Sequence, residues 1–453
     1  MAGPSPIPEI TFIGSDNQLA SRLGRPFRRF LEVEAAGGVV LLAATAVALV
    51  WANSPWSESY VDLWHTEIDV TIGNYHVGGD HHLDLEVVVN DALMVIFFFV
   101  VGLEIKRELI TGQLRDFRAA ALPAMAAMGG MAIPALIYIV FNVGTDAVDG
   151  WGIPMATDIA FAVGVVSLLG DRIGRSMKVF LLSLAIVDDI GAILVIAIFY
   201  STGISYAWLA AAAVITGIIF VLRQLRVWYI PLYVALGAAL WLATFESGVH
   251  ATIAGVVLGL ITPARPLQTR EQAARWVQWL REKGNDLFRV DIEYAAFHMR
   301  ESVSVAERLE TALHPISSFV IIPVFALANA GVDLRGGVLG EAASSPITWG
   351  VGLGLVVGKI VGVFAFTWVG QRLPFTRTPE GMTSMHLLGL SAVAGIGFTV
   401  SLFITSLAFD DPEFVDASKI GILFASAVAG LIGLAVLAYA SRRKHVYIED
   451  YTG

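Results

Sequence analysis

The stretch that decides the fold is the apolar segment 177–200, whose centre reads Leu184-Ala185-Ile186-Val187-Asp188-Asp189-Ile190-Gly191. A bilayer core of about 30 Å is crossed by roughly 20 mostly apolar residues in a helix, which is the length of this segment. A charged side chain at mid-bilayer costs roughly 2.5–3.5 kcal/mol or more. Two adjacent carboxylates at this depth must therefore be paired, hydrated or used in function.

Segments of the same kind recur along the whole chain. Hydrophobic residues make up 56% of the 453 residues and charged residues only 15%, against roughly 25% charged in soluble domains. The sequence predicts an all-α polytopic membrane protein with twelve transmembrane helices, at 34–52, 87–105, 119–141, 151–169, 177–200, 205–222, 228–245, 247–262, 315–332, 347–369, 384–408 and 418–440.

The charges of the connections support this count, because Lys and Arg accumulate in cytoplasmic loops. If the N-terminal tail 1–30 is cytoplasmic, every second connection is basic, and the opposite connections hold only Arg335. The sequence thus predicts a twelve-helix domain at 31–440 with both tails, 1–30 and 441–453, in the cytoplasm. No cleavable signal peptide is expected, and the first apolar helix directs the chain to the cell membrane.

Charge and cysteine content exclude other classes of protein. The formal net charge of −10 excludes nucleic acid as a partner, because phosphate binding requires a basic surface. With no cysteine in the chain, disulfides and thiolate metal sites are excluded as well.

Two further charged residues lie deep in predicted spans. Lys359 is central in 347–369, and its expected partner is Asp188 or Asp189. Asp158 follows Pro154 and Thr157, which predicts an interrupted helix. At the aspartate pair, a proton and a hard alkali cation compete for the same oxygens, and such competition is the physical basis of exchange.

The interrupted helix has a counterpart near the C-terminus. The span 384–408 contains Ala394-Gly395-Ile396-Gly397-Phe398, whose glycines favour a break. Each interrupted span is the second of a three-span block, 119–200 or 347–440, and the two blocks start at opposite faces. We therefore expect inverted three-helix repeats in which the interrupted helices 4 and 11 cross at the substrate site.

Two connections between spans carry structure of their own. The outer connection 58–86 contains Gly73-Asn74 between short β-prone runs, which predicts a small hairpin at 68–77. The inner connection 266–313 has apolar residues at helical spacing over 271–280. It is either an amphipathic helix on the membrane surface or a mobile charged linker.

Ionisable residues also gather near the cytoplasmic ends of two spans. Glu104, Arg107 and Glu108 share one helix end, and local ion pairs are expected there, while Glu310 and His314 open the ninth span. Histidine titrates in the physiological range, so these residues could sense pH, although ordinary headgroup-level charges are the alternative. His250 is the other deep histidine, and a satisfied buried side chain is an equal alternative there.

Several motifs make the chain, from about residue 30 to 440, resemble the NhaA-type sodium/proton antiporters. The motifs are Ala156-Thr157-Asp158-Ile159-Ala160-Phe161-Ala162, Val187-Asp188-Asp189-Ile190, Ser247-Gly248-Val249-His250-Ala251-Thr252, Phe325-Ala326-Leu327-Ala328-Asn329-Ala330-Gly331 and Gly395-Ile396-Gly397-Phe398-Thr399.

The resemblance assigns roles to residues that match these motifs. It implies that Asp188 and Asp189 bind sodium and protons, that Lys359 is the partner of Asp188, and that Thr157 supports the ion site. Asp158 and Lys359 would compensate the half-helix dipoles at the crossing.

The resemblance also implies regulation, assembly and energetics. A pH-sensing region would contain Glu104, Arg107, Glu310 and His314, and we expect Glu108 and His250 to contribute to pH sensing from their positions in the sequence. The hairpin at 68–77 would join two copies into a homodimer. Exchange would be electrogenic, with Na⁺, Li⁺ and H⁺ as transported substrates and no cofactor or enzyme activity. Thr311, where the family can carry a second histidine, and the long 266–313 connection depart from the family pattern.

Three other functions are weighed against antiport. A sodium-coupled organic-solute symporter would need a larger polar cavity than this core offers. An intramembrane aspartyl protease would need two converging aspartates, such as Asp158 and Asp188, but Lys359 would spoil their shared proton. A signalling membrane protein gives no reason for two acids at mid-depth.

Overall fold

The computed structural model describes residues 36–68, 71–72, 75–76, 84–201, 203–225, 227, 229–266, 268–283 and 288–449. Within these residues the regular secondary structure is helical except for one two-stranded hairpin and an isolated bridge between Glu67 and Asp84. The helices are α2 (Ala36–Ala52), α3 (Ser57–Trp64), α4 (Leu85–Val87), η2 (Val88–Leu93), α5 (Met94–Ile110), η3 (Gln113–Arg115), α6 (Phe117–Asn142), η4 (Asp146–Met155), α7 (Ile159–Ser167), η5 (Gly170–Arg172), α8 (Arg175–Phe199), α9 (Tyr206–Gln224), α10 (Ile230–Phe245), α11 (Thr252–Ile261), α12 (Arg270–Lys283), α13 (Arg289–Arg300), α14 (Val305–Ile316), η6 (Ser317–Ile321), α15 (Ile322–Asn329), α16 (Val338–Ser344), α17 (Pro346–Leu353), η7 (Gly354–Gly358), α18 (Lys359–Gly370), α19 (Ser384–Val393), α20 (Phe398–Ala408) and α21 (Pro412–Glu449).

The helices have the lengths and composition of a multi-pass membrane protein. Among the described residues, seven helices are long and apolar enough to cross a bilayer, and three bent helix pairs raise that number to ten. Two shorter apolar helices, Pro231–Phe245 and Thr252–Ile261, fall in the two remaining predicted spans. Every stretch predicted to cross the membrane is thus largely helical; seven of the twelve correspond to single helices that meet the length criterion, and three correspond to bent pairs that meet it only when each pair is counted as one span.

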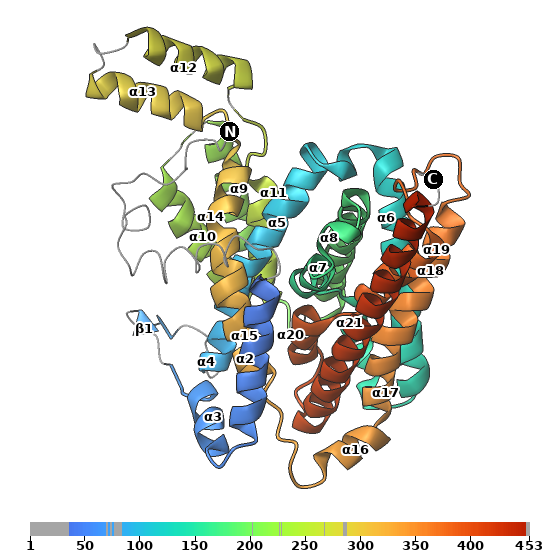
Figure 1. Ribbon diagram of the computed structural model, residues 1–453. Helices are drawn as coiled ribbons and strands as arrows, with labels where there is room; N and C mark the ends of the chain where they lie inside the picture. Colours follow the sequence, from blue (N-terminus) through green and yellow to red (C-terminus); the bar gives the residue numbers. More distant parts are fainter. Residues whose placement is uncertain are drawn as a thin grey trace, which may run out of the picture.

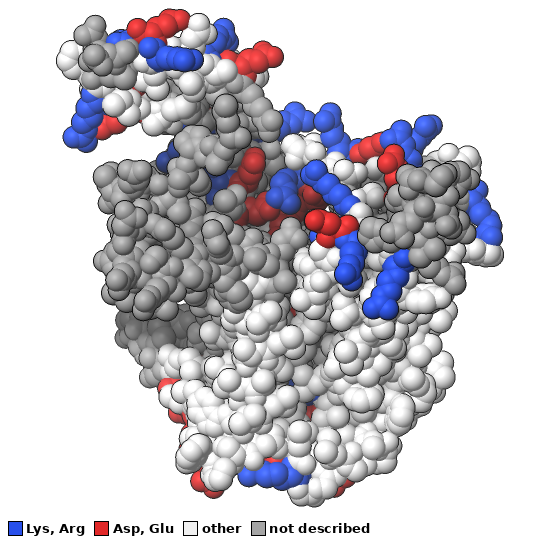
Figure 2. Space-filling view, viewed as in Figure 1, with Lys and Arg blue, Asp and Glu red and all other residues white. Residues whose placement is uncertain are grey.

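The helices form two groups (Figure 1). One group contains α2, α5, α9, α10, α11, α14 and α15, and the other contains α6, α7, α8 and α17 to α21. Figure 2 shows most of the visible Lys and Arg, together with several Asp and Glu, at the end that carries α12 and α13, above a broad band with few visible charges. We call this end of the molecule the basic face.

The second group owes its close packing to glycines. A Cβ added at Gly129 of α6 would lie 2.3 Å from the Gly362 carbonyl oxygen, and one at Gly362 of α18 would lie 2.1 Å from the Gly129 oxygen. Such distances are far inside van der Waals contact, so only glycine permits this approach. The contact brings α6 against the helix that begins with Lys359.

The connections confirm some predictions and correct others. Thr71–Ile72 pairs antiparallel with Tyr75–His76, as predicted for the hairpin. The inner connection is not a mobile linker in its described part, because α12 covers the predicted helix and α13, which was not predicted, packs against it. The last helix continues to Glu449, so much of the predicted tail 441–453 is helical. The tail 1–30 lies outside the described residues.

Candidate ion-binding site

Both interrupted helices predicted from the sequence are present. The 3₁₀ helix η4 and α7 meet at a bend of 41° around residues 156–158, and α19 and α20 meet at 45° around residues 394–397. Asp158 is the N-cap of α7, where its Oδ1 accepts a hydrogen bond of 3.0 Å from the Phe161 amide. Aspartate is favoured at the N-cap because its side-chain oxygen accepts a hydrogen bond from an otherwise unpaired backbone amide of the first helical turn.

The two breaks are hydrogen-bonded to each other. The Asp158 amide donates to the Ile396 carbonyl at 2.7 Å, and the Thr157 hydroxyl donates to the Ala394 carbonyl at 2.8 Å. Asp158 Oδ2 accepts from both the amide and the hydroxyl of Thr399, at 3.0 and 2.6 Å. One carboxylate thus caps the N-termini of both α7 and α20, where helix dipoles favour negative charge.

Lys359 lies next to this junction. Its Nζ is 2.6 Å from Asp188 Oδ2 and 2.9 Å from the Thr157 hydroxyl, and the three side chains are fully buried. As predicted, one of the two aspartates is its partner. Through Thr157, the ammonium also reaches the Ala394 carbonyl at the end of α19, where a positive charge is favoured.

Asp189 has a different environment from Asp188. Both carboxylates project into the protein rather than into lipid, with exposed fractions of 0% for Asp188 and 5% for Asp189. Lys359 binds only one oxygen of Asp188, and the Oδ1 atoms of both aspartates are buried without a hydrogen-bond partner among the described residues. These two oxygens are free acceptors for a proton or a cation.

The charges of this site do not balance. Asp158, Asp188 and Asp189 are three buried acids, and Lys359 is the one buried base beside them in the described chain. Hydrogen bonds from helix N-termini stabilise Asp158, and the ammonium stabilises Asp188. The remaining carboxylate is costly to ionise in an apolar interior unless a cation or proton joins it.

A second group of ionisable side chains lies between α5 and α14 near the basic face; we call it the Arg107 cluster and define it as Glu104, Arg107, Glu108, Glu310 and His314. Arg107 forms a short ion pair with the buried Glu310 and lies 3.9 Å from Glu108. The sequence predicted local pairs on α5, whereas the stronger contact is to α14. His314 is exposed one turn further along α14.

His250 lies apart from the Arg107 cluster, between α10 and α11. Its Nε2 is 2.6 Å from the carbonyl oxygen of Tyr200, which ends α8. The Tyr200 hydroxyl in turn donates to the Asp149 carbonyl of η4 and accepts from the Gly152 amide. His250 is therefore linked to both helices that lead into the ion site, but it does not join the Arg107 cluster.

Two site residues were missed by the sequence analysis. Thr399 binds Asp158 with two groups, and the Ser401 hydroxyl donates to the Ile153 carbonyl of η4 at 2.7 Å. The sequence indicates only that both residues lie in the first turn of the helix that follows the Gly395-Ile396-Gly397 break. Their role becomes visible only when the fold places the start of α20 against η4 and Asp158.

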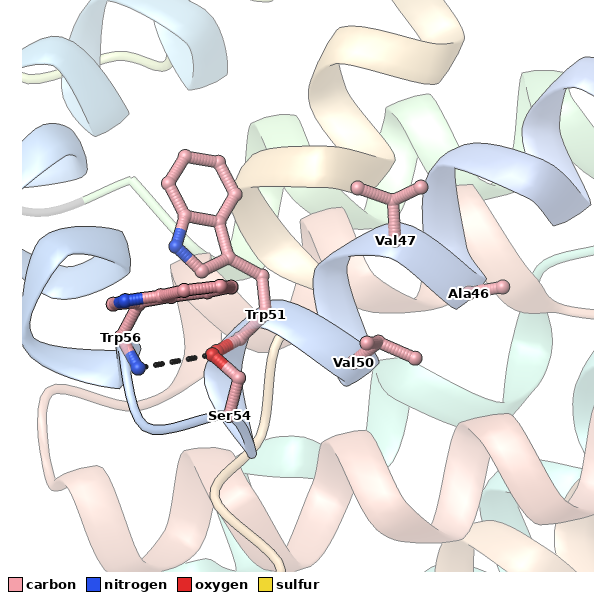
Figure 3. A pocket seen from close by; sticks show the side chains of 6 residues that line it. All are labelled: Ala46, Val47, Val50, Trp51, Ser54 and Trp56. Atoms are coloured by element: carbon pink, nitrogen blue, oxygen red, sulfur yellow. Dashed lines mark hydrogen bonds between the residues drawn. The ribbon is translucent and has the colours of Figure 1, made fainter.

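A surface groove at the end of α2 is not part of this site. It has a volume of about 450 Å³ and is lined by Ala46, Val47, Val50, Trp51, Ser54 and Trp56, whose side chains carry no charge (Figure 3). The Ser54 hydroxyl accepts from the Trp56 amide and donates to the Trp51 carbonyl. An ion would find no free ligand there.

Comparison with known proteins agrees with the geometry. Residues 28–437 match the model of the family described as Na⁺/H⁺ antiporter 1. The chain is 45% identical over 425 residues to the Na⁺/H⁺ antiporter NhaA of Rhodopirellula baltica, covering 92% of this chain and 94% of that one. It is 46% identical over 422 residues to Na⁺/H⁺ antiporter NhaA 3 of Frankia alni, covering 92% and 89%. The chain therefore belongs to the Na⁺/H⁺ antiporter 1 family.

Proposed function

We propose that this protein is a secondary antiporter that expels Na⁺ from a bacterial cell in exchange for H⁺. The observation that carries the proposal is the pair of buried carboxylates, Asp188 with Lys359 as its partner and Asp189 with a free oxygen. Membership of the antiporter family and relatives named Na⁺/H⁺ antiporter support the choice of ions.

The proposed topology has twelve spans and inverted repeats. With each bent pair counted as one span, the ten candidate spans together with the two shorter apolar helices would make up the twelve. The positive-inside rule assigns the basic face to the cytoplasm, together with both termini. The blocks 119–200 and 347–440 would be the two repeats, joined where Thr157 and Asp158 bond to Ala394 and Thr399.

Exchange follows from one competition for the two aspartates. Na⁺ binds the free oxygens of Asp188 and Asp189, with the Thr157 hydroxyl nearby. Its positive charge then takes the place of the Lys359 ammonium as the counter-charge of Asp188. The ammonium, released from its pair in an apolar setting, loses a proton. When protons return from the outside, Lys359 pairs with Asp188 again and Na⁺ leaves. Asp189 also gives up the proton that it carries when no Na⁺ is bound, so two protons are released for each Na⁺ taken up, and we therefore propose electrogenic exchange, with Li⁺ accepted as well as Na⁺.

The surrounding groups have supporting roles in this proposal. Asp158 and Lys359 compensate the helix ends at the junction. The Arg107 cluster and His250 adjust activity to pH, because α5 packs against α8, which carries both aspartates, and His250 contacts Tyr200 at the end of α8. Two copies assemble through the hairpin at 68–77.

The alternatives fit the contacts less well. A solute symporter would need a polar cavity, whereas the polar groups at the junction are already bonded, Thr157 to Ala394 and Lys359, and Thr399 to Asp158. A protease would need a shared proton between Asp158 and Asp188. Asp158 is instead bonded to Thr399, and Asp188 to Lys359.

Proteoliposomes test the proposal. With a pH-reporting dye inside and a proton gradient imposed, Na⁺ or Li⁺ pulses should release protons from wild-type vesicles. Asp189→Asn should abolish this response while the protein still folds and inserts. The matched control is Asp149→Asn. The backbone carbonyl of Asp149, and not its carboxylate, accepts the hydrogen bond from Tyr200, so this variant should retain exchange. Undiminished exchange in Asp189→Asn would overturn the assignment.

A further inference from the structure

The inner connection is a built unit of two helices. Lys283 of α12 lies 2.7 Å from Asp291 of α13 and 4.7 Å above the Trp279 ring. The Trp276 ring stacks on His298 of α13 with centroids 4.3 Å apart. The facing sides of α12 and α13 are therefore held together by an ion pair and by a stacked pair of rings.

This unit is tied to the spans beside it. The Gln268 amide donates to the Glu301 carbonyl at 3.1 Å, and Arg308 of α14 lies 3.1 Å from the Glu301 carboxylate. The Ala306 amide donates to the Pro263 carbonyl at 3.0 Å. The two segments that enter and leave the unit are thus held together, and the unit keeps a fixed direction relative to α14.

Another side of α13 carries an apolar stripe that the rest of the described chain leaves exposed. Val290, Tyr294 and Phe297 follow helical spacing, so they share one side of the helix. Their exposed fractions are 71%, 55% and 58%, although one edge of Tyr294 touches Trp276. Burying such side chains against apolar surface is favourable by roughly 25 cal/mol per Å², so a face of this kind normally meets another surface.

The placement of α13 indicates which surface this is. In Figure 1 both helices lie across the direction of the long apolar helices, and α13 is the nearer of the two to those helices. Asp291 and His298 face α12, and Val290 and Phe297 lie about a quarter turn around α13 from them, so the stripe borders the contact with α12 and is open along the flank of the unit. The unit is also basic, with six basic and four acidic side chains in the two helices of a chain whose net charge is −10.

We propose that α13 docks on the lipid surface at the basic face of the protein. Val290, Tyr294 and Phe297 enter the boundary between headgroups and acyl chains, while the exposed Arg289 and Arg300 contact anionic lipid phosphates. An interfacial helix of this kind binds through buried apolar area plus attraction to anionic lipid. Such attachment to the membrane surface is separate from ion exchange.

Spin labels on the full chain test the docking, and the absence of cysteine makes single-site labelling clean. Phe297→Cys reports on the stripe, and Ala274→Cys, on the exposed side of α12, is the matched control. Each labelled protein is placed in vesicles of phosphatidylcholine, with or without phosphatidylglycerol. Accessibility to lipid-soluble oxygen and to a water-soluble nickel complex is then measured by electron paramagnetic resonance.

The label at Phe297 should be reached by oxygen and shielded from nickel, more so with phosphatidylglycerol, while the label at Ala274 stays open to nickel. Arg289→Glu with Arg300→Glu should remove the effect of phosphatidylglycerol. Equal nickel access at both labels would overturn the proposal. So would shielding accompanied by coupling between Phe297 labels that disappears on dilution with unlabelled chain, because a second copy would then cover the stripe. Sodium-dependent proton release, measured in parallel, keeps this test separate from the proposed function.

Discussion

Thr399 donates both its amide and its hydroxyl to one oxygen of Asp158, at 3.0 and 2.6 Å, across a junction between segments 241 residues apart. The other oxygen of Asp158 accepts from its own helix. One side chain thereby joins two interrupted helices end to end. The ion site is consequently built on a junction whose two halves cannot move independently without breaking these bonds.

Removing the Thr399 hydroxyl should weaken this junction. A hydrogen bond to a charged group contributes about 1.5–3 kcal/mol, so Thr399→Val should lower the thermal unfolding temperature and slow exchange. Thr399→Ser keeps the hydroxyl and is the matched control. Unfolding temperatures in detergent, followed by fluorescence, give the comparison. Equal values for the two variants would mean that the amide alone holds the junction.

The Lys359–Asp188 pair should behave as a unit. Lys359→Met leaves a buried carboxylate uncompensated, which costs about 3–5 kcal/mol. The double variant Lys359→Met with Asp188→Asn removes both charges and should recover much of that stability. A double-mutant cycle on denaturation curves measures the coupling. If the two single effects simply add, the pair does not stabilise the fold.

The glycine contact between α6 and α18 should tolerate no side chain. Gly129→Ala and Gly362→Ala each place a methyl group on the facing backbone, and overpacking of this kind costs about 1–3 kcal/mol or more. A methyl group added at Gly217 of α9 would meet no atom within 4 Å, so Gly217→Ala should be neutral or stabilising. Thermal unfolding of the three variants decides the point. A stable Gly129→Ala protein would show that the two helices can separate.

The Arg107 cluster should set the pH range of activity. Arg107→Ala removes a positive charge that favours ionised acids around it, so the pH of half-maximal exchange should rise. Glu310→Gln breaks the same ion pair but removes a negative charge, and its profile should move the opposite way. Exchange rates over a pH series provide the measurement. Parallel shifts in both variants would indicate a structural rather than an electrostatic effect.

The loop after α15 offers a pH test outside the spans. Arg335 donates twice to Asp333, which lowers the pKa of this carboxyl from its ordinary value to about 2. A lowered folded-state pKa means that the pair stabilises the fold above the ordinary aspartate pKa and loses this effect as the pH falls toward 2. Arg335→Ala should therefore lower the unfolding temperature slightly near neutral pH, and the difference should vanish in strong acid. A difference that grows in acid would contradict the assignment.

Much of the fold was predictable because a bilayer restricts what a chain can do. Long apolar runs have to be helices there, and Pro154 and the glycines at 395 and 397 marked both interruptions correctly. The helix α13 was missed because its apolar residues alternate with charges and its packing on α12 depends on Trp276 and Lys283, which precede it. The partner of Arg107 was also missed, since Glu310 is distant in sequence.

By itself, the sequence determined that this chain is a helical membrane protein, and it predicted that its charged residues at mid-depth are the centre of its function. The physical reason is local: solvation in lipid penalises each polar residue individually, so the residues that remain are informative without knowledge of their neighbours. The residues themselves left open which of the two adjacent aspartates Lys359 contacts, and the family resemblance pointed to Asp188; the tertiary structure shows that contact and shows that Thr399 completes the junction. These contacts depend on the relative rotation of helices that are far apart in the chain, and local pattern carries no record of that rotation.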